Sequence, residues 1–152
     1  MNLLEVGMDT TNANVGYLIK RLSEALDRNA NNLMRPLGVS ISQMRVLTEI
    51  DESPNGYRSL KELEQKIGVS QPTIWGIAKR LEEKGLVEVV PDVSRSKLLK
   101  LTEAGHETRM EGMKIMDGSE AILIRGLDDQ EARTLSSLLA RVRDNLDAPE
   151  RA

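Results

Sequence analysis

Hydrophobic side chains recur every three or four positions over most of the chain, which is the spacing of one face of an α-helix. The first such run predicts a long amphipathic helix from about Asn12 to Met34, ended by Pro36 and Gly38. Its apolar positions are Val15, Leu18, Ile19, Leu22, Ala25, Leu26 and Leu33. A helix with so apolar a face needs another surface to cover it.

Two shorter helices follow, and each begins with a capping box, in which a side chain and a backbone N–H satisfy each other. The pairs are Ser40 with Gln43 and Ser59 with Glu62. A Ser-Pro-Asn-Gly turn within Glu52–Gly56 separates the two helices. Their inward positions are Met44, Val46, Leu47 and Ile50, then Leu60, Leu63 and Ile67.

The stretch Ser70–Lys84 predicts the helix around which the chain is organised. Ser70 is a good N-cap, Pro72 is tolerated in a first turn, and Gly85 ends the helix. The apolar face of this helix comprises Ile74, Ile77, Ala78 and Leu81. A short helix, a tight turn at Gly68 and a second helix form a helix-turn-helix, whose second helix enters the major groove of DNA. Taken alone, the second helix could also be an ordinary surface helix with a solvated polar face.

One position departs from the usual helix-turn-helix pattern. Glu64 stands where a small residue normally lets the two helices close. Either a wider crossing of the helices or an outward-turned Glu64 would accommodate it. The other core positions around the Gly68 turn are apolar, namely Leu63, Ile67, Val69, Ile74 and Ile77.

The pattern becomes strand-like after Gly85. Leu86–Val90 and Lys97–Leu101 predict two short strands, joined by a hairpin loop over Pro91–Ser96. Pro91 belongs at a strand end, because proline cannot donate to a central ladder. A hairpin that directly follows a recognition helix is a wing, and the alternative is a plain hairpin with solvated charges.

Two long helices complete the pattern, from about Glu103 to Ile124 and over Asp129–Asp147. Thr102 can cap the first, and Asp128 with Glu131 can cap the second. The last helix carries a narrow apolar stripe, as in a helix–helix seam, made by Leu135, Leu138, Leu139, Val142 and Leu146.

The apolar faces of these terminal helices could fold back on the middle of the chain or pair with the same helices of a second chain. Their distance in sequence from the helix-turn-helix favours pairing, which predicts a two-fold homodimer. We expect residues 1–36 and 103–152 to form a helical dimerisation region, and residues 40–102 to form a winged helix-turn-helix DNA-binding domain. The expected fold is therefore mainly α with a small β wing. A two-fold dimer would read a pseudo-palindrome whose half-sites lie about 34–36 Å apart.

Composition narrows the classes of function. The chain has 152 residues, no Cys and one His, which excludes disulfides, thiol chemistry and a Cys/His zinc site. No apolar run approaches about 18 residues and no signal pattern opens the chain, so we expect a cytoplasmic protein without a membrane partner.

Charge is distributed unevenly. The net charge of −3 argues weakly against a nucleic-acid partner, but local charge matters more than the sum. From Gln71 to Lys100 there are six basic and four acidic residues, whereas from Asp128 to Ala152 there are four basic and six acidic ones. The acidic end would have to face away from DNA.

Polar, basic and stacking groups on the predicted recognition helix and wing are the candidate DNA contacts. Arg95 near the wing tip can enter the minor groove, while Ser94 and Lys97 can meet phosphates. Trp75 either touches a sugar or a thymine methyl, or packs on the wing. The full set is Ser70, Gln71, Thr73, Trp75, Gly76, Lys79, Arg80, Ser94, Arg95 and Lys97.

Catalytic chemistry is not indicated, so we expect no enzyme, cofactor or metal. The chain lacks a Gly-rich phosphate loop and a nucleophile–His–acid order. His106 is alone and is interpreted as a partly exposed residue at a helix boundary. Met110, Met113 and Met116 are typical of core filler, although they could line an adaptable pocket.

The chain resembles the MarR family of bacterial winged helix-turn-helix regulators. Its helix order is similar to that of the family over nearly the whole chain, but its wing is about two residues shorter and holds a single Arg. The matching stretches are Leu60–Gly68, Val69–Ile74, Lys79–Val87, Pro91–Asp92, Arg95 and Leu101–Gly105.

The resemblance implies a homodimeric transcription regulator, a repressor, that a small-molecule effector releases from its operator. Such a ligand would lie between the dimer helices and the DNA-binding unit, although no residue there is diagnostic. The alternative is a winged-helix protein-interaction module with little DNA affinity, which the acidic balance and the apolar Trp75-Gly76 pair favour.

Overall fold

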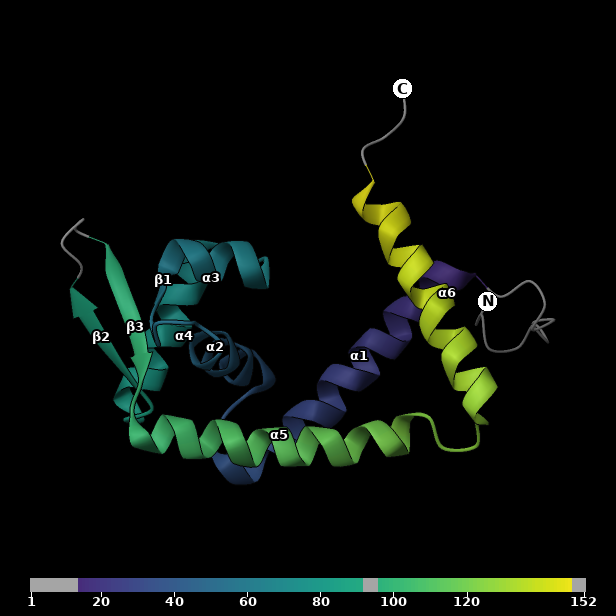
Figure 1. The fold of residues 1–152 in the computed structure, drawn as a ribbon, viewed down its shortest axis with the longest axis horizontal. Coiled ribbons are helices and arrows are strands. Elements are labelled where there is room, and N and C mark those ends of the chain that lie inside the picture. The colour runs from purple at the N-terminus through teal and green to yellow at the C-terminus, as the bar shows by residue number, and fades with distance from the viewer. Residues whose placement is uncertain (1–13, 92–95, 149–152) are drawn as a thin grey trace, which may run out of the picture. The chain divides into compact units, whose positions relative to one another are not determined.

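The described chain is mainly helical with one small antiparallel sheet, which confirms the predicted fold class (Figure 1). The computed structural model describes residues 14–91 and 96–148. Its elements are α1 (Val15–Met34), the 3-10 turn η2 (Arg35–Leu37), α2 (Ile41–Asp51), β1 (Arg58–Ser59), α3 (Leu60–Ile67), α4 (Gln71–Glu83), β2 (Val87–Pro91), β3 (Lys97–Leu101), α5 (Glu103–Leu123) and α6 (Asp129–Asp147).

The helix starts follow from local hydrogen bonding. The three predicted capping boxes are all present, at Ser40, Ser59 and Asp128. The side chain of Asn14 caps α1 by accepting from the backbone N–H of Tyr17 at 3.1 Å. The predicted start of this helix at residue 12 lies outside the described residues.

The sheet has the strand order β1-β3-β2, and β1 was not predicted because it is only two residues long. The first predicted strand is displaced by one residue, since β2 begins at Val87 and includes Pro91. Leu86 instead donates its N–H to the carbonyl of Leu81 at 2.9 Å, which closes the end of α4. Pro91 lies opposite Lys97 at the end of the ladder.

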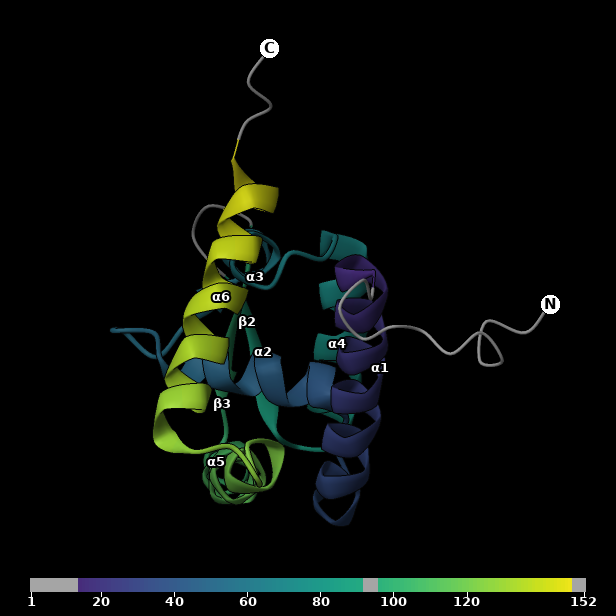
Figure 2. The same ribbon diagram turned by 90° about the vertical axis from the view of Figure 1, so that its right-hand side faces the viewer.

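The backbone forms two compact units, which divide between residues 115 and 116. In the first unit, α2 lies in front of β2 and β3 (Figure 2) and packs on β3.

Val69 was expected in the core but is 36% exposed, because it follows the Gly68 turn and lies outside both helices. Side chains fully buried in the core include Met34, Leu47, Ile50, Leu63, Ile74, Leu81 and Leu99.

The second unit contains the end of α5 and all of α6. The leucines of the α6 stripe are exposed, with Leu139 at 46% and Leu146 at 82%. No helix among the described residues is long and apolar enough to cross a membrane. The predicted division into a DNA-binding and a dimerisation region concerns function and stays a prediction.

A close contact joins the start of α5 to the end of α4. Thr102 caps α5 as predicted, because its hydroxyl accepts from the N–H of Gly105 at 3.1 Å and donates to the carbonyl of Gly85 at 2.6 Å. Gly105 is buried, and a Cβ at this position would lie 1.9 Å from the carbonyl oxygen of Leu86. Gly112 is also buried, against the thioether of Met44.

We predict that Gly105→Ala lowers the free energy of unfolding by about 1–3 kcal/mol, because the backbone at Leu86 must move to admit the methyl group. Gly76→Ala is the matched control, since nothing lies within 4 Å of a Cβ there. It should raise the free energy of unfolding by about 0.5–1 kcal/mol, as expected for a helix interior. Urea denaturation measures both, and equal effects would contradict the assigned contact.

Candidate nucleic-acid interface

The core fixes which side of α4 faces outward. Ile74, Ala78 and Leu81 are fully buried, whereas Ile77, which was predicted to share that face, is only half-buried. Gly68 has a φ of 80°, a left-handed conformation that turns the chain sharply between α3 and α4. The helix-turn-helix geometry therefore follows from one glycine and a short apolar stripe.

The first turn of α4 is held by two hydroxyl groups. Ser70 accepts from the backbone N–H of Thr73 at 3.4 Å, and the two hydroxyl oxygens lie 3.0 Å apart. Both residues are exposed. Their hydroxyls still have free hydrogen-bonding capacity, because each hydroxyl can donate once and accept twice.

Four of the predicted contact residues on α4 have exposed side chains, namely Gln71, Thr73, Lys79 and Arg80. Gly76 lies among them with open space at its missing Cβ, so this stretch of the helix is flat. The structure thus gathers polar and basic groups around a point where another molecule can approach the backbone closely.

Glu64 is turned outward, which resolves the alternative left by the sequence. Its carboxylate accepts a hydrogen bond from the side-chain amide of Gln71, with Nε2 and Oε2 2.8 Å apart. Glu64 is half-buried and Gln71 is exposed. An acid on α3 is therefore tied directly to the first residue of α4.

Trp75 packs on the wing, which is one of its two predicted roles. The ammonium of Lys97 on β3 lies 3.7 Å from the centroid of the indole ring, and that of Lys79 lies 5.5 Å from it. Both separations are within the range of cation–π attraction. Trp75 therefore contacts the wing at the start of β3, next to the hairpin loop.

Lys79 on α4 and Lys84 just after it both donate hydrogen bonds to other groups of the chain. Lys79 donates to Glu82 at 2.8 Å, and this hydrogen bond and the charge of Glu82 raise the pKa of the lysine. The same hydrogen bond lowers the pKa of Glu82, so the pair is fully charged at neutral pH. Lys84, counted above among the basic residues, bonds the carbonyl of Gly38 and the side chain of Gln43.

The wing is described only in part. The predicted contacts Ser94 and Arg95 lie outside the described residues. Lys97 is exposed at the start of β3, and further along the ladder Glu88 pairs with Lys100 at 3.4 Å. Of the three wing residues predicted from the sequence, the structure therefore places Lys97.

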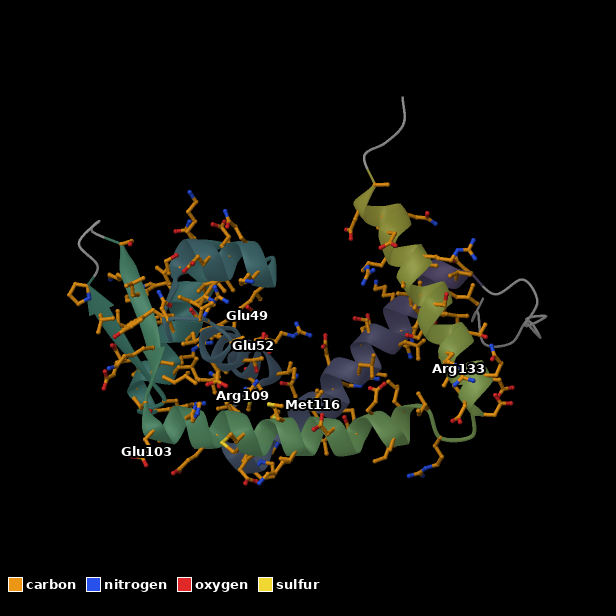
Figure 3. The ribbon with its side chains drawn as sticks, viewed as in Figure 1. Glu49, Glu52, Glu103, Arg109, Met116 and Arg133 are labelled. Carbon is orange, nitrogen blue, oxygen red and sulfur yellow. The ribbon has the colours of Figure 1, made fainter. Side chains whose placement is uncertain are left out.

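A second polar cluster joins α5 to the end of α2 and was not found from the sequence. Asp51 accepts from Nδ1 of His106 at 2.7 Å and pairs with Arg109 at 3.2 Å. Arg109 also lies 3.8 Å from Glu52, and Figure 3 shows it on α5 facing that end of α2. The contact spans more than 50 positions, so no local pattern could indicate it.

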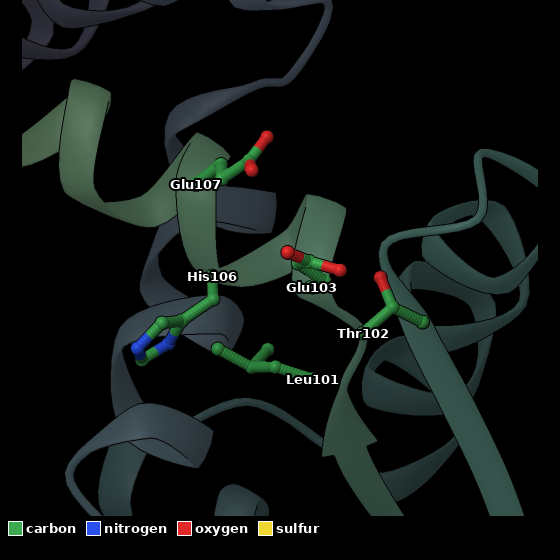
Figure 4. A pocket seen from close by; sticks show the side chains of 5 residues that line it. All are labelled: Leu101, Thr102, Glu103, His106 and Glu107. Atoms are coloured by element: carbon green, nitrogen blue, oxygen red, sulfur yellow. The ribbon is translucent and has the colours of Figure 1, made fainter.

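The surface beside His106 is a shallow hollow at the start of α5 (Figure 4). His106 itself is 58% exposed, as expected for a helix-boundary residue. Among the described residues no group of three or more His, Cys, Asp or Glu is placed to hold a metal ion. The hollow is lined by Leu101, Thr102, Glu103, His106 and Glu107.

We predict that Lys97→Ala makes Trp75 more accessible to acrylamide, because the lysine covers one face of the ring at 3.7 Å. Trp75 is the only tryptophan, so its fluorescence reports this site alone. Lys79→Ala is the control and should increase quenching less, since Lys79 lies further from the ring. An unchanged quenching constant in Lys97→Ala would show that the wing does not cover Trp75.

Known proteins resemble this chain along most of its length. A family model described as MarR family matches residues 37–96. The "Uncharacterized HTH-type transcriptional regulator YybA" of Bacillus subtilis (strain 168) is 30% identical over 135 residues, which are 85% of this chain and 86% of that protein.

Solved structures agree with this assignment. A mutant of MarR from E. coli complexed with operator DNA is 28% identical and has a TM-score of 0.75, covering 84% of this chain and 91% of that one. CouR from Rhodococcus jostii RHA1 bound to p-coumaroyl-CoA is 21% identical with a TM-score of 0.75, covering 92% and 96%, and shows the shared fold. The helix-turn-helix, its hairpin wing and these relatives together establish that the chain belongs to the MarR family of transcriptional regulators, whose members are not enzymes.

Proposed function

We propose that this regulator binds operator DNA with α4 in the major groove and the β2–β3 wing beside it. The observation that carries the proposal is the outward face of α4, where polar and basic side chains surround the open backbone of Gly76. MarR from E. coli, which shares 28% identity with this chain, has been solved in complex with operator DNA. The proposed contact residues are those predicted from the sequence, Ser70, Gln71, Thr73, Trp75, Gly76, Lys79, Arg80, Ser94, Arg95 and Lys97. Trp75 packs on the wing, so it can offer DNA only the accessible part of its half-buried side chain.

Gly76 supports the proposal because the fold gives no reason for a glycine there. Its φ is not positive, and a Cβ would meet nothing within 4 Å among the described residues. A glycine in a helix interior costs about 0.5–1 kcal/mol relative to alanine. Close approach of a DNA backbone or base edge would explain why this position carries no side chain.

We also propose a homodimer. Exposed apolar side chains line both α1 and α6, and monomeric proteins rarely expose large contiguous apolar patches. Pairing with a second chain would cover these stripes and present two copies of α4 to a pseudo-palindromic site. The exposed residues are Val15, Tyr17, Leu18, Leu22 and Leu26 on α1, and Leu135, Leu138, Leu139 and Leu146 on α6.

The proposed regulation is repression that a small molecule relieves. The fold can hold a ligand, since CouR, which shares it, was solved with p-coumaroyl-CoA bound. By linkage, an effector that releases the operator must bind the free protein more tightly than the DNA-bound protein.

We predict that Gly76→Ala weakens operator binding although it stabilises the fold, because its methyl group would enter the space kept for DNA. An operator is first selected from a random duplex pool, and affinity is then measured by fluorescence anisotropy at several salt concentrations. The unmodified protein should lose affinity steeply as salt rises, since several phosphate contacts release counterions.

The outcomes separate the two candidate functions. Weak binding with little salt dependence would favour the protein-interaction module. Equal affinity of Gly76→Ala and the unmodified protein would remove Gly76 from the interface while leaving DNA binding intact.

We predict that Leu139→Asp dissociates the dimer, because dimerisation would bury an unpaired carboxylate. Ser137→Asp adds the same charge on the opposite side of α6 and should leave the dimer intact. Sedimentation velocity measures both variants. A dimeric Leu139→Asp would contradict the role given to the α6 stripe.

A further inference from the structure

Glu64 is an unusual residue for the surface on which it lies. Its carboxylate is beside the start of α4, where DNA phosphates would approach and repel it. Among the described residues its side chain makes one hydrogen bond, from Nε2 of Gln71 at 2.8 Å. At a DNA-facing position this repulsion weakens binding, so an acid there is expected only if it contributes to recognition.

The contact fixes the orientation of the Gln71 amide. An ionised carboxylate can only accept hydrogen bonds, so the NH₂ group of the amide must face Glu64 and the carbonyl oxygen must point elsewhere. One of the two N–H groups is then occupied. Gln71 is exposed, and it keeps one N–H donor and one carbonyl acceptor for another molecule.

This remaining pair discriminates between the two purines. In the major groove adenine offers an acceptor at N7 and a donor at N6, which match one N–H and one carbonyl oxygen. Guanine offers acceptors at both N7 and O6, so it requires two donors. A glutamine whose second N–H is held by a carboxylate cannot supply both.

We infer that Glu64 is a positioning residue that restricts Gln71 to reading adenine and rejecting guanine in each half-site. The inference rests on the proposed function, because it requires α4 to lie in the major groove. It also accounts for the departure from the usual small residue at position 64. A small residue there would leave the amide of Gln71 free to rotate.

The test uses duplexes that carry the selected operator with adenine or guanine at each half-site position in turn. The unmodified protein should prefer adenine at one position by roughly 5- to 150-fold, the range of one bidentate contact. Gln71→Ala should abolish this preference and so locate the position. Glu64→Ala should reduce the preference at least about fivefold, and adding Glu64→Ala to Gln71→Ala should change it no further.

Glu83→Ala is the matched control, because it removes the same charge from an exposed position of α4. It should strengthen binding to adenine and guanine duplexes alike. Thermal unfolding checks that each variant folds, and Glu64→Gln serves as a second variant that keeps the size of the side chain.

Two results would overturn the inference and leave the proposed function standing. In the first, Glu64→Ala keeps the full adenine preference and strengthens binding uniformly, as Glu83→Ala does. In the second, Glu64→Ala removes a preference for cytosine that Gln71→Ala leaves intact, which would mean that Glu64 contacts a base itself. If the unmodified protein shows no salt-sensitive DNA binding, the proposed function fails and the inference fails with it.

Discussion

The burial of one narrow apolar stripe on α4 is the constraint on which the rest of the interface depends. Ile74, Ala78 and Leu81 are inaccessible to solvent, so the helix cannot rotate about its axis without exposing them. Every polar group that faces outward is placed by that packing. The left-handed turn at Gly68 then sets how α4 leaves α3.

The sheet and α5 continue from this packed helix with little freedom. Leu86 bonds back to the end of α4, and its carbonyl receives the N–H of Thr102 at 3.1 Å. Gly105 allows α5 to begin against that same carbonyl. The recognition helix, the base of the wing and the first turns of α5 are therefore joined directly to one another, and Trp75 and Lys97 add a contact between helix and strand.

The elements could be predicted from the sequence because their causes are local. Capping boxes at Ser40, Ser59 and Asp128 and the turn at Gly68 depend on residues within four positions of one another. The buried and outward faces of α4 were predicted from the 3.6-residue period of hydrophobic positions in a helix. Short strands such as β1 have no such signature, because two residues cannot show a period.

The side-chain contacts at the candidate site could be predicted only as alternatives, or not at all. The sequence left open whether Glu64 turned outward and whether Trp75 packed on the wing, since both depend on where another element lies. The contact of Asp51 with His106 and Arg109 joins residues more than 50 positions apart, and neither side of it carries a motif. Ion pairs between residues far apart in the sequence cannot be predicted from the spacing of residue types along the chain.

That last contact has a consequence for how the chain can change over evolutionary time. Arg109 has 14% of its side chain exposed and Asp51 has 17%. Loss of Asp51 would leave the largely buried Arg109 with only Glu52, at 3.8 Å, and loss of Arg109 would leave Asp51 with only His106. Neither position can drift alone without a cost to stability. We expect the two positions to vary together among relatives, as an acid with a base or as two uncharged residues. Such covariation would be evidence for the contact between α2 and α5.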